Sequence, residues 1–433
     1  MDFSIFLYIA ILLIVGLLST RLMKILKMPN VTGYIITGII MGPFVFGLLF
    51  NNFSYDGIKE SVIYQHVDKL SWVSTIALGF IAFSIGTSFK GSSLKSVGKR
   101  VLIITILEAT CASLLVILAL MVAHFISPDT VSWQLVLTLG AIASATAPAA
   151  TLMVIKQYNA RGNLVNTLLP VVALDDAAAL ILFAILFQVA KGLSSGEYSI
   201  YSMLLKPLIE IVISIGFGLV IGIIISLLNK FFKSRNNRLI LCIFSVFLSV
   251  GLYMLFRLEN LGSFELSSLL MCMTAGMVYV NFSKDSGKTY DLLDRFTSPI
   301  YMMFFILSGA CLDFTIIFSS KGYIILIIAL IYIVFRVVGK WLGAFSGAAI
   351  THCEPKIKKY LGFTLIPQAG VAIGLATTAN KLFSETPNMA ETGGLILAII
   401  LTSTLVYELV GPLVSKYALT KAGEISNKEN LSK

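Results

Sequence analysis

Apolar segments long enough to cross a bilayer recur almost without interruption along this chain of 433 residues. Only 12% of its residues are charged and 57% are hydrophobic, more apolar surface than a water-soluble core could bury. Because lipid offers no hydrogen-bond partner to a bare backbone, segments of this length must be helices. We therefore predict an all-α polytopic membrane protein with thirteen transmembrane helices, at residues 4–25, 31–50, 70–88, 100–126, 132–156, 163–190, 204–228, 239–256, 262–282, 297–318, 322–350, 357–380 and 392–415.

The positive charges fall on alternate connections between these segments. Loops after the odd-numbered segments, together with the C-terminal tail, hold 23 of the 32 Lys and Arg residues. Since short cytoplasmic loops are enriched in Lys and Arg, the asymmetry predicts an N-terminus outside the cell and a C-terminus in the cytoplasm, which an odd number of spans satisfies. Charges spread over loops form no single basic face, so we expect no nucleic-acid partner despite the net charge of +10.

Two adjacent carboxylates, Asp175 and Asp176, lie inside the sixth segment in the run VVALDDAAALILF. An ionisable side chain near the bilayer centre costs about 2.5–3.5 kcal/mol on insertion scales, so each one needs a reason. Two like charges this close in a low dielectric disfavour each other, and at least one can exchange a proton near neutral pH. Successive helical residues point about 100° apart, so the two can serve different partners. We favour an ion-exchange site over a pair that only makes static interhelical hydrogen bonds.

Among the other ionisable residues inside predicted spans, five stand out. Arg336 and Lys340 are four residues apart on one helix face and can neutralise acids of other helices. We expect Glu108, in the fourth segment, to pair with Arg336 and stabilise the fold. Glu210 and Glu408 lie nearer to predicted helix ends, where an interfacial position explains them.

Two predicted spans contain residues that interrupt a helix. In the fifth segment Pro148 removes a backbone donor and clashes with the preceding turn, and in the twelfth Pro367 and Gly370 weaken the helix. Either interruption alone could be a simple kink, but their matching places in the two halves favour true breaks. A break frees carbonyl oxygens and helix ends that can bind a cation beside the aspartates, and Thr146 and Thr151 add hydroxyl oxygens.

The fourth to sixth segments and the eleventh to thirteenth segments have the same order: a helix with charged residues, a broken helix, and a helix with an acid. The second set begins seven segments after the first. An odd offset reverses the direction of crossing, so the two sets form inverted repeats, as alternating-access transporters use.

These features resemble the bacterial Asp-Asp type of monovalent cation/proton antiporter, in the second cation:proton antiporter branch of the sodium/hydrogen exchanger family. The resemblance covers nearly the whole chain and rests on ASATAPAAT followed by LDDAAAL, and on ILSGACLDF, FRVVGKWLGAFSGA, IPQAGVAIGL and STLVYELVGPLVSKYALTKAGEI. It implies that the two broken helices cross, that Asp176 binds the cation, and that Asp175 pairs with Lys340. Arg336, one turn away, is an alternative partner for Asp175.

The resemblance also implies a homodimer in which a core domain moves like an elevator against a dimerisation domain. The corresponding boundaries are 1–99 for dimerisation helices 1–3, 100–190 for core helices 4–6, 191–318 for linker helix 7 and dimerisation helices 8–10, 319–415 for core helices 11–13, and 416–433 for a short cytoplasmic tail.

The implied activity is electrogenic antiport of a monovalent cation for protons, with Na⁺ as the first choice and Li⁺ or K⁺ as alternatives. It would operate in the bacterial inner (plasma) membrane, serve pH homeostasis, and need neither a cofactor nor an enzymatic step. Two other readings stay open: a sodium-coupled organic-anion symporter on a similar inverted-repeat fold, and a membrane receptor that transports nothing.

Overall fold

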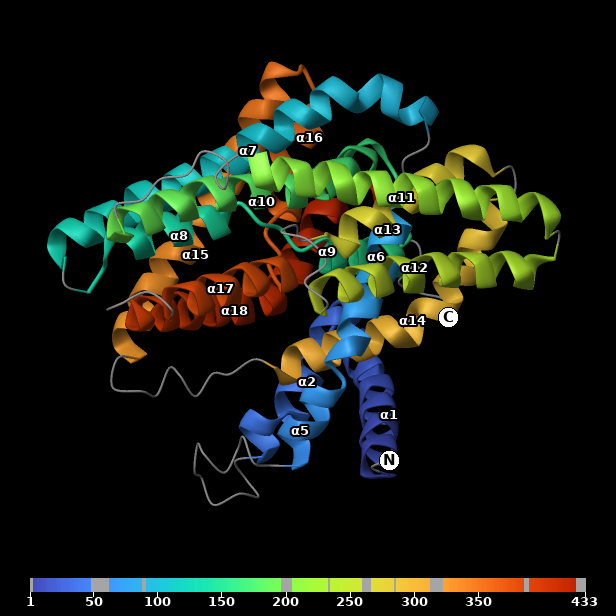
Figure 1. Cartoon of the computed structure of the whole chain (residues 1–433), viewed down its shortest axis with the longest axis horizontal. Coiled ribbons are helices and arrows are strands. Elements are labelled where there is room, and N and C mark those ends of the chain that lie inside the picture. The colour runs from blue at the N-terminus through green and yellow to red at the C-terminus, as the bar shows by residue number, and fades with distance from the viewer. Residues whose placement is uncertain are drawn as a thin grey trace. The chain divides into compact units, whose positions relative to one another are not determined.

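The computed structural model describes residues 3–47, 62–87, 91–128, 130–195, 205–232, 234–258, 266–283, 286–311, 322–384 and 389–425. Within these ranges the regular structure is entirely helical, with sixteen α-helices and a short π-helix (Figure 1). The all-α fold class is confirmed. The chain divides into two compact units, which are described separately below.

Unit 1 comprises Met1–Leu22, Tyr34–Gly98 and Leu205–Cys311. Its elements are α1 (Phe3–Ile25), α2 (Asn30–Met41), the π-helix η1 (Pro43–Gly47), α5 (Val62–Lys69), α6 (Ser71–Thr87), α11 (Lys206–Phe231), α12 (Arg235–Leu258), α13 (Ser268–Phe282) and α14 (Ser286–Ala310). Helices α6 and α13 touch through glycines: a Cβ on Gly86 would lie 2.0 Å from the carbonyl oxygen of Met273, and one on Gly276 would lie 2.4 Å from that of Phe83. Small residues permit this close approach of membrane helices.

Unit 2 comprises Met23–Gly33, Lys99–Leu204 and Leu312–Lys433. Its helices are α7 (Gly91–Ile126), α8 (Trp133–Ala143), α9 (Pro148–Gln157), α10 (Asn163–Ser195), α15 (Gly322–Ile350), α16 (Pro355–Thr364), α17 (Gly370–Ser384) and α18 (Ala390–Ala422). Helices α17 and α18 run side by side (Figure 1). The apolar core of this unit joins α7, α8, α10, α15, α17 and α18.

Both predicted breaks are present in unit 2. Helix α8 ends at Ala143 and α9 begins at Pro148, while α16 ends at Thr364 and α17 begins at Gly370. The two breaks meet directly, because the backbone N–H of Ala147 donates to the carbonyl oxygen of Pro367 over 2.8 Å. Pro148 occupies the first helical position of α9, where its missing N–H costs nothing. The prediction of two crossing broken helices is confirmed.

The described helices can be compared with the thirteen predicted membrane spans. Helices overlap all thirteen predicted segments, two of them as broken pairs, and α5 is an additional short helix. Eight helices of the described ranges are long and apolar enough to cross a membrane. The count of thirteen spans therefore stays a prediction. The predicted domain boundary at 318/319 and residues 426–433 of the predicted tail lie outside the described residues.

The last helix is longer than predicted. Helix α18 continues to Ala422, beyond the predicted end of the thirteenth segment at 415, so residues 416–422 of the predicted tail are helical. Gly423 then turns the chain in the left-handed region at φ 77°. Both oxygens of the Glu424 carboxylate accept backbone N–H groups of α10, from Leu164 over 2.6 Å and from Val165 over 2.9 Å. The end of α18 thereby satisfies the free donors at the start of α10.

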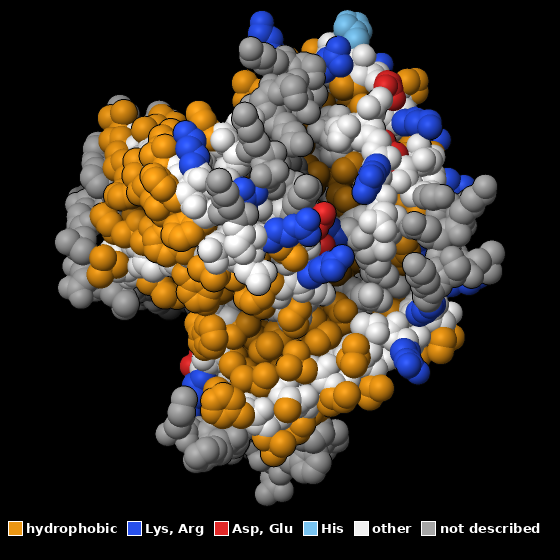
Figure 2. Space-filling view, turned by 90° about the vertical axis from the view of Figure 1, so that its right-hand side faces the viewer, with side chains coloured by type: hydrophobic (Ala, Val, Ile, Leu, Met, Phe, Trp, Pro, Cys, Tyr) orange, Lys and Arg blue, Asp and Glu red, His pale blue; other side chains and the backbone are white. Residues whose placement is uncertain are grey.

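Large apolar side chains also cover the outside of the described helices. On α7, Leu114 is 57% and Val122 is 58% exposed, and on α15 Leu330 is 62% exposed. Figure 2 shows hydrophobic side chains gathered over broad areas of one face. Such surfaces are stable against lipid tails and not against water, which agrees with a multi-pass membrane protein.

Candidate functional site

Helix α10 carries the aspartate pair, and its two carboxylates have different surroundings. Asp175 is fully buried, whereas Asp176 is partly accessible. Atom Oδ1 of each residue is buried and has no hydrogen-bond partner among the described residues. The pair therefore consists of one acid held inside the protein and one acid with an accessible side.

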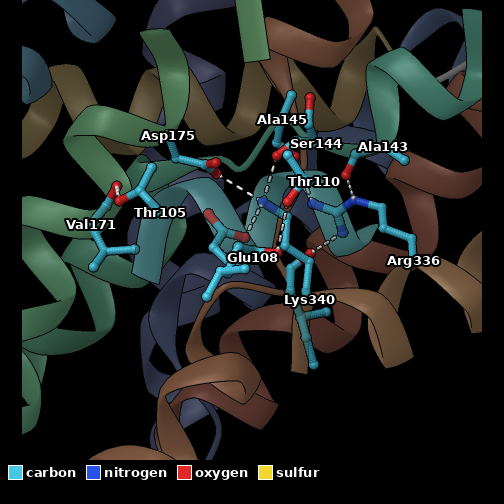
Figure 3. A network of polar contacts seen from close by, with 12 residues as sticks. Thr105, Glu108, Thr110, Ala143, Ser144, Ala145, Val171, Asp175, Arg336 and Lys340 are labelled. Atoms are coloured by element: carbon cyan, nitrogen blue, oxygen red, sulfur yellow. Dashed lines mark hydrogen bonds and ion pairs between the residues drawn. The ribbon is translucent and has the colours of Figure 1, made fainter. Parts of the chain in front are cut away.

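Lys340 of α15 lies between two carboxylates (Figure 3). Its Nζ atom is 2.9 Å from Oδ2 of Asp175, to which it donates a hydrogen bond, and 2.6 Å from Oε2 of Glu108. The contact with Glu108 is an ion pair without hydrogen-bond geometry. The ammonium group also donates to the carbonyl oxygen of Ser144 in the first break. All three charged side chains are fully buried, so water does not screen the attraction.

A glycine stripe on α15 explains why Lys340 reaches Glu108 on α7. Gly339, Gly343 and Gly347 are spaced four residues apart and lie on one helix face. A Cβ on Gly343 would lie 2.4 Å from Cα of Glu108, and one on Gly339 would lie 2.6 Å from Cα of Ala112. The two backbones thus approach closely, as in the small-residue packing of membrane helices, and place the lysine beside the glutamate.

The side chain of Arg336 donates hydrogen bonds to both broken helices where they cross. It donates to the carbonyl oxygens of Ala143 at 3.0 Å, Ala145 at 2.6 Å and Ile366 at 2.7 Å. Its guanidinium carbon also lies 4.6 Å from the centre of the Tyr407 ring. These carbonyls are freed where α8 and α16 end, and the partial negative charge of helix C-termini attracts a cation.

The expected pairing of Glu108 with Arg336 is therefore wrong. The guanidinium group is used by backbone carbonyls, and Glu108 pairs with Lys340 one turn further along α15. The Lys340–Asp175 contact has the partners that the family resemblance implied. Sequence reasoning did not foresee that one lysine would serve two acids.

Gln368 is a part of this network that sequence analysis missed. It follows Pro367 directly, and its Nε2 donates to the carbonyl oxygen of Ile142 over 2.9 Å. Its Oε1 accepts from the hydroxyl of Tyr332 over 3.1 Å. A fully buried amide beside a membrane proline was the available signal, because such a group must find partners.

The two threonines near the first break have different places. Thr146 lies in the break, and its buried hydroxyl has no partner among the described residues. Thr151 lies in α9, where its hydroxyl donates to the carbonyl oxygen of Thr364 over 3.0 Å. Since Lys340 joins Ser144 and Asp175, the break with Thr146 adjoins the aspartates, whereas the bond of Thr151 ties α9 to the end of α16.

The remaining two acids are carried by α11 and α18. Glu210 is half-buried on α11 of unit 1. Glu408 is only 3% exposed, so the expected interfacial position is wrong for it. The cause is packing, because other helices of unit 2 lie against α18 and cover this side chain.

Solved structures of other proteins share this fold. Two structures of the sodium proton antiporter MjNhaP1 from Methanocaldococcus jannaschii match with 18% sequence identity each. The one at pH 8 has a TM-score of 0.67 and covers 98% of both chains, and an electron-microscopy structure has a TM-score of 0.75 and covers 100% of both chains.

The sequence comparisons agree with the fold. Sodium/hydrogen exchanger 7 from Arabidopsis thaliana is 25% identical over 326 residues, which make up 73% of this chain but only 27% of that protein. The family described as "Sodium/hydrogen exchanger, transmembrane" matches residues 9–416. With nearly its whole length matched in this way, the chain belongs to the sodium/hydrogen exchanger family.

Proposed function

We propose that the chain exchanges a monovalent cation for protons, with Asp176 as the cation-binding acid and Asp175 as its lysine-coupled neighbour. One observation carries the proposal. Lys340 forms an ion pair with Asp175 at 2.9 Å, while the partly accessible Asp176 has a buried oxygen, Oδ1, without a hydrogen-bond partner among the described residues. An acid of this kind can bind either a cation or a proton. The unpartnered hydroxyl of Thr146 is a further oxygen for the cation, and Thr151 is expected to support the break.

Coupling follows from competition at the aspartates. A cation and protons bind the carboxylates in turn, and only a neutralised site crosses the low dielectric of the membrane. Exchange then requires no further gate, because a site that holds neither a cation nor a proton remains charged and cannot cross the membrane. In this scheme Lys340 releases a proton when its partner Asp175 changes state as the cation binds Asp176. Two protons per cation would make the exchange electrogenic.

We infer that residues 100–190 and 319–415 form the moving core, and that residues 1–99 and 191–318 form the dimerisation domain with linker helix 7. The site residues all lie in unit 2, which supports movement of that unit as a body. The protein would act as a homodimer in the bacterial inner membrane, with its N-terminus outside and its C-terminus in the cytoplasm, and contribute to pH homeostasis.

Na⁺ is the cation we propose, with Li⁺ and K⁺ as weaker candidates, because the relatives are named for sodium. An organic-anion symporter would need a wide polar cavity at the broken helices. The crossing is instead filled by Arg336, Gln368 and Tyr332.

The test uses full-length protein in proteoliposomes with a pH-sensitive dye. Addition of Na⁺, Li⁺ or K⁺, with the membrane potential either free or clamped, reports ion choice and electrogenicity together. We expect Asp176→Asn to abolish cation-driven proton flux and Glu210→Gln, an intramembrane acid of unit 1, to retain it. Normal flux from Asp176→Asn protein would refute the proposal.

A further inference from the structure

Helix α18 carries a buried acid that the mechanism above does not use. Glu408 is 3% exposed, and Thr404, one turn before it on the same helix face, is fully buried. In the described part of the chain, neither Oε2 of Glu408 nor the hydroxyl of Thr404 has a hydrogen-bond partner. Buried polar atoms are normally paired, so two unpaired ones in adjacent turns indicate a site that takes up something else.

The helix face with Thr404 and Glu408 points at the crossing of the broken helices. Gly411, three residues after Glu408, packs on the second break, since a Cβ added to it would lie 2.9 Å from Cγ of Pro367. One turn further, the hydroxyl oxygen of Ser415 is 3.5 Å from that of Thr151. Positions 404, 408, 411 and 415 share one side of a helix. Glu408 therefore lies one turn from the crossing, on the opposite repeat from the aspartates.

The charged side chains described around α18 leave Glu408 without a counter-charge. Helices α8, α9, α15, α16 and α17 pack against α18. Arg336 donates to three backbone carbonyls, and Lys340 binds the other two buried acids. Among the described side chains of these helices, the other titratable groups are partly or fully exposed or are engaged in hydrogen bonds. Lys156, Tyr158, Tyr323, Lys356, Lys358, Lys359 and Tyr360 are accessible at the surface, and the hydroxyls of Tyr332 and Tyr407 donate hydrogen bonds.

A buried carboxyl group without a counter-charge is stable only when neutral. A metal ion would neutralise it, but hard cations take several oxygen ligands at once, and among the described side chains of α18 the Thr404 hydroxyl is the only other buried oxygen without a hydrogen-bond partner. A proton needs one oxygen. Glu408 also keeps a small accessible surface, whereas Asp175 has none, so a proton can reach it in the folded protein.

We propose that Glu408, with Thr404 beside it, is a second proton-binding site of unit 2, separate from the aspartate pair, and that its protonation sets the pH range of transport. An ionised Glu408 would place an unpaired charge one turn from the crossing that holds the ion site, whereas a protonated one leaves the crossing undisturbed. The effect on transport rests on the proposed antiport function, but the binding of the proton does not.

The test combines infrared titration with transport on the full-length protein. The carbonyl stretching band of a protonated carboxylic acid should disappear in Glu408→Gln and persist in Glu210→Gln, the control acid on α11. In proteoliposomes, Glu408→Gln should retain Na⁺-driven proton flux but shift the pH of half-maximal flux by about one unit, the usual scale for a change around one ionising group. An unchanged infrared titration in Glu408→Gln overturns the proposal, and so does an unchanged pH profile.

Two further variants test the proposal if the Glu408→Gln protein folds poorly. Glu408→Asp keeps a carboxyl group and should move both the band and the pH profile, and Thr404→Val should shift the band by removing the neighbouring hydroxyl. If neither variant changes the infrared spectrum, Glu408 is not a proton-binding site and the proposal is wrong. The Asp176→Asn protein separates the two proposals, because its Glu408 band should remain whether or not it exchanges ions. Normal exchange by this protein would refute the proposed role of Asp176 and leave the Glu408 site standing.

Discussion

Helices α10 and α18 occupy matching places in the two inverted repeats, yet their acids have opposite surroundings. Asp175 on α10 has a lysine at 2.9 Å, and that lysine is shared with Glu108. Glu408 on α18 is also buried, with 3% of its surface exposed, but has no cation beside it in the described structure. A counter-charge allows a buried acid to stay ionised, whereas an acid without one must bind a proton. In the two proposals above, the same fold element serves ion exchange in one repeat and carries a neutral carboxyl group in the other.

The largest expected effect comes from removing the shared cation. Lys340→Met would leave Asp175 and Glu108 buried without a counter-charge, and breaking a buried pair costs about 3–5 kcal/mol. Thermal unfolding of the purified protein in detergent should show this loss, while Glu408→Gln should stay near the wild-type value. Lys356→Met, at an exposed lysine of α16, is the matched control. If the Lys340→Met and Lys356→Met proteins were equally stable, Lys340 would not be a needed counter-charge for the buried acids, and the contrast between Asp175 and Glu408 would fail.

A smaller effect is expected from the coupling between the two acids that share Lys340. Either Asp175→Asn or Glu108→Gln leaves the ammonium group with one carboxylate, so the second substitution should cost more than the first. We expect a non-additive free energy of unfolding of about 1–3 kcal/mol in the double-mutant cycle. Additive losses would mean that the lysine has only one energetically important partner. Pairing Glu408→Gln with Asp175→Asn should, by contrast, give additive losses.

The smallest effect is expected at the contact between the C-terminal end of α18 and the start of α10. Glu424→Ala removes the carboxylate that accepts the N–H groups of Leu164 and Val165 at the start of α10, and loss of such a cap costs about 1 kcal/mol. Glu354→Ala, which removes an exposed hydrogen bond to Asn163, should cost at most about 0.5 kcal/mol. Thermal unfolding of both variants checks the order. A larger loss in Glu354→Ala would show that the Glu424 contact does not hold α10.

The helices and the two breaks could be predicted because each has a strong local cause. Long apolar runs require helices in lipid, and Pro148 and Pro367 interrupt them at sites that the structure reproduces. The aspartates stood out because charge inside a membrane is expensive. These signals depend only on residues near one another in the sequence.

The partners of the buried charges could not be predicted in the same way. Lys340 meets Glu108 because Gly339 and Gly343 bring α15 against α7, a register that spacing along one helix does not fix. Arg336 was assigned to an acid because carboxylates are its usual partners, although the breaks had freed carbonyl oxygens nearby. For Glu408 the error was of the same kind, because the helices that cover it come from distant parts of the sequence.

The three hydrogen bonds of Arg336 bear on how the protein can change shape. One guanidinium group holds Ala143 and Ala145 of the first broken helix and Ile366 of the second. Pulling the two breaks apart would strand a cation in a dry interior, so bending at the crossing is the expensive route. Ions would then be carried by displacement of the crossing as one rigid piece, and the barrier to that displacement would reside in contacts at its outer surface.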